Sequence, residues 1–380
     1  MKLLVLAIDG LDYRFLRSWR YPALSSWRDG ARWGVLWSAE KRTGPSWTTI
    51  MTGWTTGHHG VNTLFGVKVN PNPDPKKRPP WGHVPSTTFA QRPRDYLFDE
   101  AWRAGLKAAA VNMPGMPTPR PPGEGPARDR GFLVGGWPYR PWGSPESVVI
   151  PEDYYTGEAD ASRRCEQVLA IKPPGAGMGW EIHAWPFQSW AAWIDEQDGY
   201  KIDLAKRWAD ETGGLDLLMI CTQMWDRGAH MLCSKSQGEG IGAYDPRLLE
   251  ILGPILDRWV DKAISTFDPE EVAICSDHGF GDRGHTYTGV WGINHAGLSP
   301  FERGSIPTID QADFAPTMLG RLGIDAGFGR PIRRDGFDRL AEPKARIPEE
   351  LAQPIEEDLD EDEMMQRRTL AALGYIEGEY

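Results

Sequence analysis

Polar side chains that could bind divalent metal ions follow several apolar runs of the sequence. They are Asp9, Asp226, His230, Asp277 and His278. His230 comes four residues after Asp226, so the two side chains point the same way if that stretch is helical or forms a tight turn. Aspartate and histidine together suit Zn²⁺, with Mn²⁺ as the alternative, better than an all-oxygen Mg²⁺ site. These residue types predict a centre of divalent metal ions.

Hydroxyl side chains crowd the segment TGPSWTTIMTGWTTGHHG at 43–60 and could supply a nucleophile. A hydroxyl ahead of the Gly-Pro turn, with a helix beginning behind it, lies near a positive helix end, which favours an attacking oxygen anion. Thr43 has this position, Ser46 and Thr48 are alternatives, and Ser46 is also expected to cap the helix N-terminus. His58 and His59 are expected to organise the loop after this helix. Two metal ions about 3.5–4 Å apart would let such a hydroxyl attack phosphorus.

Short apolar runs predict the strands that position these groups. The runs span 3–8, 108–112, 215–222 and 272–276. Helices are expected at 22–30, 95–105 and 247–266, the last with a kink at Pro254. Apolar strands that alternate with helices predict an α/β fold with helices on both faces of the sheet. In such sheets, sites form beyond the carboxyl ends of the strands, so the polar residues above are expected to converge there.

Segments rich in proline, glycine and tryptophan interrupt this pattern. A single catalytic domain is expected over 1–348, with cap insertions at about 67–95 and 113–200. The second insertion contains Trp180, Trp185, Trp190 and Trp193, which are expected to pack the core and the cap and to offer one or two rings for stacking on a substrate. Residues 349–380 are expected to form an acidic tail with a short helix near 367–373.

The chain has 380 residues and a formal net charge of −11, which is unevenly distributed. Nine acidic residues and no basic one lie between 349 and 363, and without them the net charge is only −2. The acidity argues against a protein that coats nucleic acid, since such proteins are usually basic. No apolar run is long enough for a transmembrane helix, and the apolar start is too short for a signal peptide. Four scattered cysteines without a Cys-x-x-Cys pair favour a cytoplasmic protein without disulfides.

Four motifs, in this order, resemble the alkaline phosphatase superfamily and specifically its type I phosphodiesterase/nucleotide pyrophosphatase branch. The motifs are AIDGLD, TGPSWTTIMTG followed by GHHGV, MWDRGAH, and SDHGFGD. Further similarity lies in AVNMPGMPTP, in residues 313–324 and in LAALGYI. The resemblance implies an alkaline-phosphatase-like α/β sandwich with a central, mostly parallel sheet, helices on both faces and cap insertions.

The resemblance also implies two metal sites and a nucleophile. One metal would be held by Asp9, Thr43, Asp277 and His278, with Thr43 as the nucleophile. The other would be held by Asp226, His230 and a late histidine. His285, in GHTYTGVWGI, is the expected late ligand, and His295, in GINHAGL, is the alternative. Asn62 is a candidate for binding a phosphoryl oxygen.

The implied activity is hydrolysis of a phosphodiester or a nucleotide pyrophosphate through a covalent phospho-threonine intermediate, with two divalent ions, Zn²⁺ first and Mn²⁺ second. A phosphomonoesterase is an alternative, and so is a silent member that binds ligands or partners. A sulfatase is disfavoured because Thr43 cannot become the required aldehyde and the Arg of the sulfatase motif is absent. The expected partner is a small-molecule phosphoester or nucleotide, without stable nucleic-acid or membrane binding. The oligomeric state is not predicted.

Overall fold

A computed structural model describes residues 1–38, 41–59, 95–114, 129–134, 149–150, 186–235, 246–281, 284–295 and 308–325. Asn62, the expected insertion up to residue 94, and the acidic tail at 349–380 lie outside the described residues. Among the described helices, none is long and apolar enough to span a membrane.

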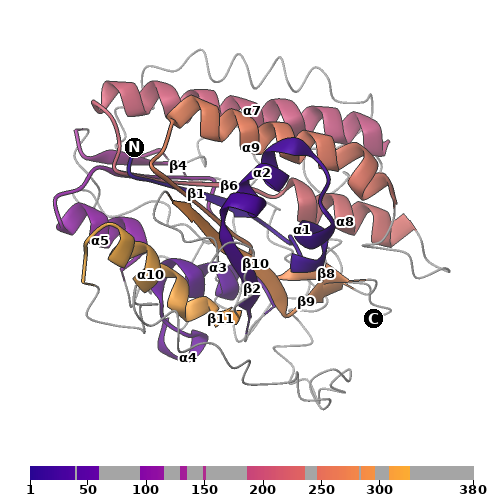
Figure 1. The fold of residues 1–380 in the computed structure, drawn as a ribbon, viewed down its shortest axis with the longest axis horizontal. Helices are drawn as coiled ribbons and strands as arrows, with labels where there is room; N and C mark the ends of the chain where they lie inside the picture. Colours follow the sequence, from indigo (N-terminus) through magenta and orange to yellow (C-terminus); the bar gives the residue numbers. More distant parts are fainter. Residues whose placement is uncertain are drawn as a thin grey trace, which may run out of the picture.

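A central sheet of nine strands forms the middle layer, in the order β11-β2-β10-β7-β1-β6-β3-β4-β5 (Figure 1). The strands are β1 (Leu3–Ile8), β2 (Arg32–Trp37), β3 (Ala108–Val111), β4 (Gly131–Val134), β5 (Val149–Ile150), β6 (Leu217–Thr222), β7 (Glu271–Cys275), β10 (Thr288–His295) and β11 (Thr308–Asp310). Strands β7, β1, β6, β3 and β4 run parallel, whereas β10 and β5 run antiparallel to their neighbours. A separate hairpin consists of β8 (Gly279–Gly281) and β9 (Gly284–Thr286). The expected mostly parallel sheet is confirmed.

Helices cover both faces of this sheet (Figure 1). One face carries α1 (Tyr13–Ser18), α2 (Pro22–Gly30), α7 (Phe187–Glu211), α8 (Met224–Lys235) and α9 (Gly253–Phe267). The other carries α3 (Thr43–Thr52), α5 (Leu97–Arg103) and α10 (Phe314–Arg321), with the short α4 (Thr56–His59) packed next to α3. All six residues of β1 are buried, and they contribute alternately to the two cores. A strand covered on both faces has no polar side, which is why this segment is uniformly apolar.

The helix expected at 247–266 is present. A π-helical turn at Leu248–Leu252 runs without interruption into α9, so the helical backbone continues to Phe267. Pro254 lies directly after this π-helical turn, at the second residue of α9, and both features favour the expected kink.

Part of the expected insertion at 113–200 belongs to the central layers. Strands β4 and β5 are sheet strands, and the segment from Phe187 onward is the long helix α7. Trp190 is buried in the core under α7, and Trp193 packs against the same core. These two tryptophans therefore pack in the core of the main fold, which is one of the two roles expected for them, because their spacing places them on the core-facing side of an amphipathic helix.

Candidate active site and metal-binding cluster

The candidate site lies at the carboxyl ends of three adjacent parallel strands, β7, β1 and β6. Asp9 follows β1, Asp277 follows β7, and Asp226 lies in the first turn of α8, just after β6. Because these strands are neighbours in the sheet, their ends bring the three carboxylates together without any long loop.

Gly10 allows two of these carboxylates to approach closely. It has φ +75°, and a Cβ built there would lie 2.9 Å from the Cβ of Asp226. The backbone N–H of Asp226 donates to the carbonyl of Asp9, at 3.2 Å. Only glycine fits a left-handed turn at such a close approach, so the Asp-Gly pair in AIDGLD is explained by geometry.

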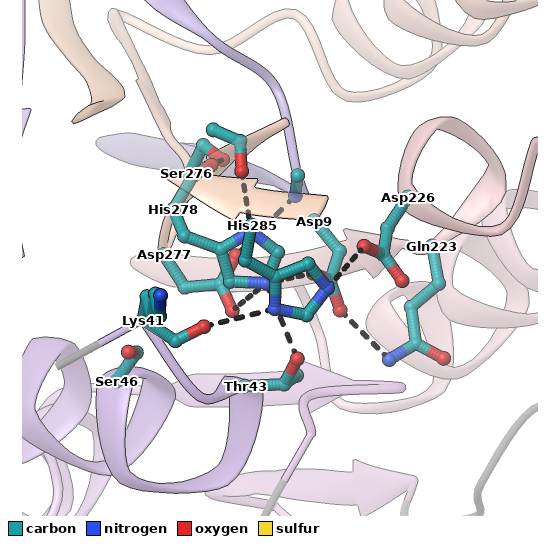
Figure 2. Close-up of polar contacts among 12 residues, drawn as sticks. Asp9, Lys41, Thr43, Ser46, Gln223, Asp226, Ser276, Asp277, His278 and His285 are labelled. Atoms are coloured by element: carbon teal, nitrogen blue, oxygen red, sulfur yellow. Dashed lines mark hydrogen bonds and ion pairs between the residues drawn. The ribbon is translucent and has the colours of Figure 1, made fainter. Parts of the chain in front are cut away.

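His278 lies at the centre of one group of ligands. Its Nε2 is 3.5 Å from Asp9 Oδ1, 3.3 Å from Asp277 Oδ2 and 3.3 Å from Thr43 Oγ1. Figure 2 shows these side chains, from β1, β7 and the start of α3, directed at one another. The four residues expected to share one metal are thus in contact.

His285, on β9, lies at the centre of the second group. Its Nε2 is 3.1 Å from Asp226 Oδ1 and 2.9 Å from His230 Nε2. His230, on α8, lies one helical turn from Asp226, with 3.5 Å between its Nε2 and Asp226 Oδ1. The rings of His278 and His285 stack at 3.7 Å between centroids, which joins the two groups into one cluster.

His295, the alternative late ligand, lies far from this cluster. It pairs in register with Glu271 at the beginning of β7, whereas Asp277 follows the end of that strand. Six residues of extended chain span about 20 Å. Of the two histidines, the structure places only His285 among the carboxylates.

The protonation pattern of the cluster suits metal binding. His278 Nδ1 contacts the carbonyl of Gly279 at 3.0 Å, and His285 Nδ1 contacts the carbonyl of Lys41 at 2.9 Å. A carbonyl can only accept, so each Nδ1 carries a proton, and in the neutral ring the lone pair is on Nε2, which faces the cluster. This arrangement is typical of histidines that bind metals through Nε2.

Three buried carboxylate oxygens accept no hydrogen bond from any described residue. They are Asp9 Oδ1, Asp226 Oδ1 and Asp277 Oδ2. Asp9, Asp277 and His278 form one group, and Asp226, His278 and His285 another, whose ligand atoms lie within 4.8 Å of one another. Buried carboxylate oxygens are normally paired or bound to a metal. The residues present therefore fit two divalent cations.

The electrostatics of the cluster lead to the same conclusion. Burial, and next the charge of Asp226, raise the pKa of Asp9 to about 7. Burial and the charge of Asp9 raise the pKa of Asp277 well above its usual range. Burial would also raise the pKa of Asp226, but His230 and His285 outweigh it and hold this pKa below its ordinary value. Bound cations would remove this mutual repulsion of the carboxylates.

The pKa values of His278 and His285 shift in opposite directions. Burial, reinforced by the charge of His285, lowers the pKa of His278 well below its ordinary value, so this imidazole is neutral and able to bind metal. Burial opposes protonation of His285 too, but the Asp226 carboxylate, 3.1 Å from His285 Nε2, outweighs this and raises the pKa of His285. Bound cations would displace that proton, because only the neutral ring binds a metal.

Of the three candidate hydroxyls on α3, the structure brings only Thr43 to the cluster. The helix begins at Thr43 itself, so the expectation that Ser46 caps it is wrong. Ser46 lies within the first turn, where its N–H donates to the carbonyl of Arg42 and its Oγ contacts Ser38. The Thr48 hydroxyl donates to the carbonyl of Gly44, at 2.8 Å. Position at the first residue of a helix gives Thr43 the positive end of the helix dipole.

Two glutamines also contact aspartates of the cluster and were not predicted. Gln223 donates through Nε2 to Asp9 Oδ2, at 2.9 Å, and Gln311 donates to the backbone carbonyl of Asp277. Gln223 directly follows β6, so the rule on strand ends could have identified it. Gln311, at the start of the 3-10 turn Gln311–Asp313, has no such signal. His59 bonds to Thr49 on α3, at 3.0 Å, which agrees with its expected role in organising the loop.

A model of the family described as type I phosphodiesterase/nucleotide pyrophosphatase matches residues 3–290. A search of curated proteins finds no match.

Several solved structures are similar to the chain. An inactive form of murine ectonucleotide pyrophosphatase/phosphodiesterase 5 in complex with AMP is 10% identical, with 90% of this chain and 99% of that chain covered and a TM-score of 0.50. Another structure of that murine protein is 14% identical, with 74% of this chain but only 58% of that chain covered and a TM-score of 0.40. The phosphonate monoester hydrolase of Agrobacterium radiobacter is 13% identical, with coverage of 85% and 73% and a TM-score of 0.48. A sulfatase from Pseudoalteromonas sp. is 14% identical, with coverage of 86% and 68% and a TM-score of 0.46.

Proposed function

The chain belongs to the type I phosphodiesterase/nucleotide pyrophosphatase family, and from this premise we propose that it hydrolyses phosphodiesters or nucleotide pyrophosphates with two bound metal ions. Family and fold support phosphoester hydrolysis in general. The finer assignment depends on one observation: the Thr43 hydroxyl lies 3.3 Å from His278 Nε2, within a buried cluster of three aspartates and three histidines.

In the proposed reaction, the Thr43 hydroxyl loses its proton and its Oγ forms a bond to phosphorus while the bond from phosphorus to the leaving oxygen breaks, and the leaving oxygen takes up a proton. Water then attacks phosphorus, breaks the bond to Thr43 Oγ and restores the hydroxyl. The N-terminal end of α3 stabilises negative charge on Oγ during both steps.

Two divalent ions would be held by the two ligand groups, Asp9, Thr43, Asp277 and His278 in one and Asp226, His230 and His285 in the other. When bound, they would supply a Lewis acid that lowers the pKa of the nucleophile and neutralises phosphoryl oxygens. Zn²⁺ is the proposed metal, because its preferred ligands are this mixture of imidazole and carboxylate. Gln223 and Gln311 would hold Asp9 and Asp277 in place.

We prefer diesters and pyrophosphates as substrates because the hydroxyl at the cluster belongs to a threonine. A threonine at this position is typical of the phosphodiesterase/nucleotide pyrophosphatase branch of the superfamily. The murine protein solved in complex with AMP is an inactive variant with a threonine replaced by alanine, which supports a threonine nucleophile here. Thr43 also argues against a sulfatase, because a threonine cannot be converted to the aldehyde that sulfatases use.

Activity toward three aryl substrates tests the proposal. The purified chain is supplied with Zn²⁺ or Mn²⁺ and assayed with a bis-aryl phosphodiester, an aryl phosphomonoester and an aryl sulfate. We expect the diester to be cleaved fastest, Thr43→Ala to abolish turnover, and Thr43→Ser to retain part of it. Thr48→Val is the matched control, because it removes a hydroxyl from the same helix that bonds only to Gly44 among the described contacts.

Each result has a defined consequence. Fastest cleavage of the monoester would replace the diester assignment, and no cleavage by the metal-loaded protein would refute the hydrolase. Full activity of Thr43→Ala would show that the nucleophile is another group.

A further inference from the structure

Asp12 is a buried carboxylate outside the metal-binding cluster, and it contacts the segment that carries His285. Its side chain is 0% exposed. Oδ1 accepts from the backbone N–H of Arg14 at 2.8 Å and caps the short helix α1. Oδ2 accepts from the hydroxyls of Thr286 and Thr288, both at 3.1 Å. The two oxygens thus serve different elements.

The two threonines lie on either side of the connection from β9 to β10. Thr286 directly follows His285, and neighbouring side chains of a strand point to opposite sides. His285 can therefore face Asp226 while Thr286 faces Asp12. A carboxylate that holds Thr286 and Thr288 fixes the backbone from which His285 projects.

The hairpin needs such an anchor because it is small. Strands β8 and β9 have three residues each and form a sheet of their own. A lone two-stranded hairpin is at best marginally stable in water, so contacts with the rest of the fold must place it. The Asp12 contact is also tightly packed: a Cβ at Gly279 of β8 would lie 2.3 Å from Asp12 Oδ2.

Arg14 balances the charge of Asp12. Its Nε and Nη2 donate to the two carboxylate oxygens at 2.7 and 2.9 Å, and 43% of the arginine side chain is exposed. The ion pair balances the charge of the buried carboxylate without involving the histidines, and a carboxylate holds a hydroxyl more strongly than a neutral acceptor does.

We propose that Asp12 is a positioning residue for the metal site that contains His285, acting through the hydroxyls of Thr286 and Thr288. The inference rests on the proposed two-metal function. The loop from Asp9 to Asp12 then serves both sites, since it supplies a ligand to one metal and orients a ligand of the other. Loss of such an outer contact typically weakens metal affinity about 10- to 100-fold.

Calorimetric titration of the metal-free full chain with Zn²⁺ tests the proposal. The double variant Thr286→Val/Thr288→Val removes both hydroxyl donors with little change of shape, and Asp12→Asn removes the charge. His285→Ala and Asp277→Asn identify which binding event belongs to which site. Asp257→Asn is the control, because Asp257 is a buried carboxylate that caps another helix, through bonds from the N–H groups of Ala23 and Leu24.

We expect the double valine variant and Asp12→Asn to weaken, about 10- to 100-fold, only the event that His285→Ala removes. The other event, and both events in Asp257→Asn, should be unchanged. Unchanged affinities in both variants would overturn the positioning role, and so would equal weakening of the two events, which indicates general loosening. Wild-type protein that binds no Zn²⁺ would overturn the metal-dependent function as well, which separates the two failures.

Discussion

Replacing Asp9 with asparagine should stabilise the metal-free protein at alkaline pH, although it removes a proposed metal ligand. Asp9 is fully buried beside Asp226 and Asp277, and burial raises its pKa from 3.8 to about 7. A carboxyl group with a raised pKa binds its proton more strongly in the folded than in the unfolded chain. Its contribution to stability therefore falls as the pH rises from about 4 to about 7, and asparagine removes this loss.

The magnitude follows from the two pKa values. A pKa difference of one corresponds to about 1.36 kcal/mol, so at pH 8 the ionised group costs the fold about 4 kcal/mol. At pH 5 the folded protein keeps the proton, and the cost is about 2 kcal/mol, which reflects ionisation of the unfolded chain alone. The stability advantage of Asp9→Asn should thus grow by about 2 to 3 kcal/mol between pH 5 and pH 8.

Urea unfolding followed by circular dichroism, in the presence of a chelator, measures this difference. Asp216→Asn is the control. Burial would raise the pKa of Asp216, but its bonds from the Lys107 N–H and Lys2 outweigh this and lower the pKa, so the carboxylate is ionised in both states above pH 5. The effect of Asp216→Asn should be destabilising and constant from pH 5 to pH 8.

With saturating Zn²⁺ the wild type should become more stable than Asp9→Asn, because the wild type then gains binding energy that the variant lacks. The reasoning is refuted if the stabilities of the wild type and Asp9→Asn run parallel from pH 5 to pH 8 without metal. Parallel curves would mean that burial and the charge of Asp226 do not raise the pKa of Asp9 in the fold.

Two further predictions follow from the geometry. His285→Ala should lose one of two bound Zn²⁺ ions by elemental analysis while His295→Ala keeps both, because only His285 lies beside Asp226; equal losses would contradict this placement. Gly279→Ala should lower the melting temperature strongly, since its Cβ would lie within 2.5 Å of Asp12 and of the Thr288 carbonyl. Gly320→Ala is the control: a Cβ there meets open space in α10, so this variant should gain about 0.5–1 kcal/mol of stability. A mild effect of Gly279→Ala would show that the hairpin can shift.

The elements of the fold could largely be predicted from the sequence. Strand β1 and helix α2 have the predicted bounds, and β6 and β7 differ from theirs by one or two residues. Local pattern is sufficient here, because a strand buried on both faces must be apolar throughout and a surface helix must repeat its apolar residues.

The π-helical turn before α9 and the sheet strands within the expected insertion at 113–200 were not predicted. Both depend on which neighbour packs against the segment, and local pattern does not contain that information.

For the candidate site, the sequence by itself determined the residue types and the strand ends on which they lie. Asp9, Asp226 and Asp277 could be placed together because parallel strands end at one edge of a sheet. Only the tertiary structure decided between Thr43, Ser46 and Thr48, since hydroxyls a few residues apart on one helix point in different directions.

The position of His285 also could not be predicted from the sequence, because its partner is far away in the chain. It reaches Asp226, 59 residues earlier, only because the β8–β9 hairpin folds back toward α8. Asp12 and Gln223 likewise acquire partners 274 and 214 positions away. The sequence thus determined which chemistry is available along the chain. The packing of distant segments decided which side chains meet, because hydrogen bonds and metal ligands depend on position in space rather than on position in sequence.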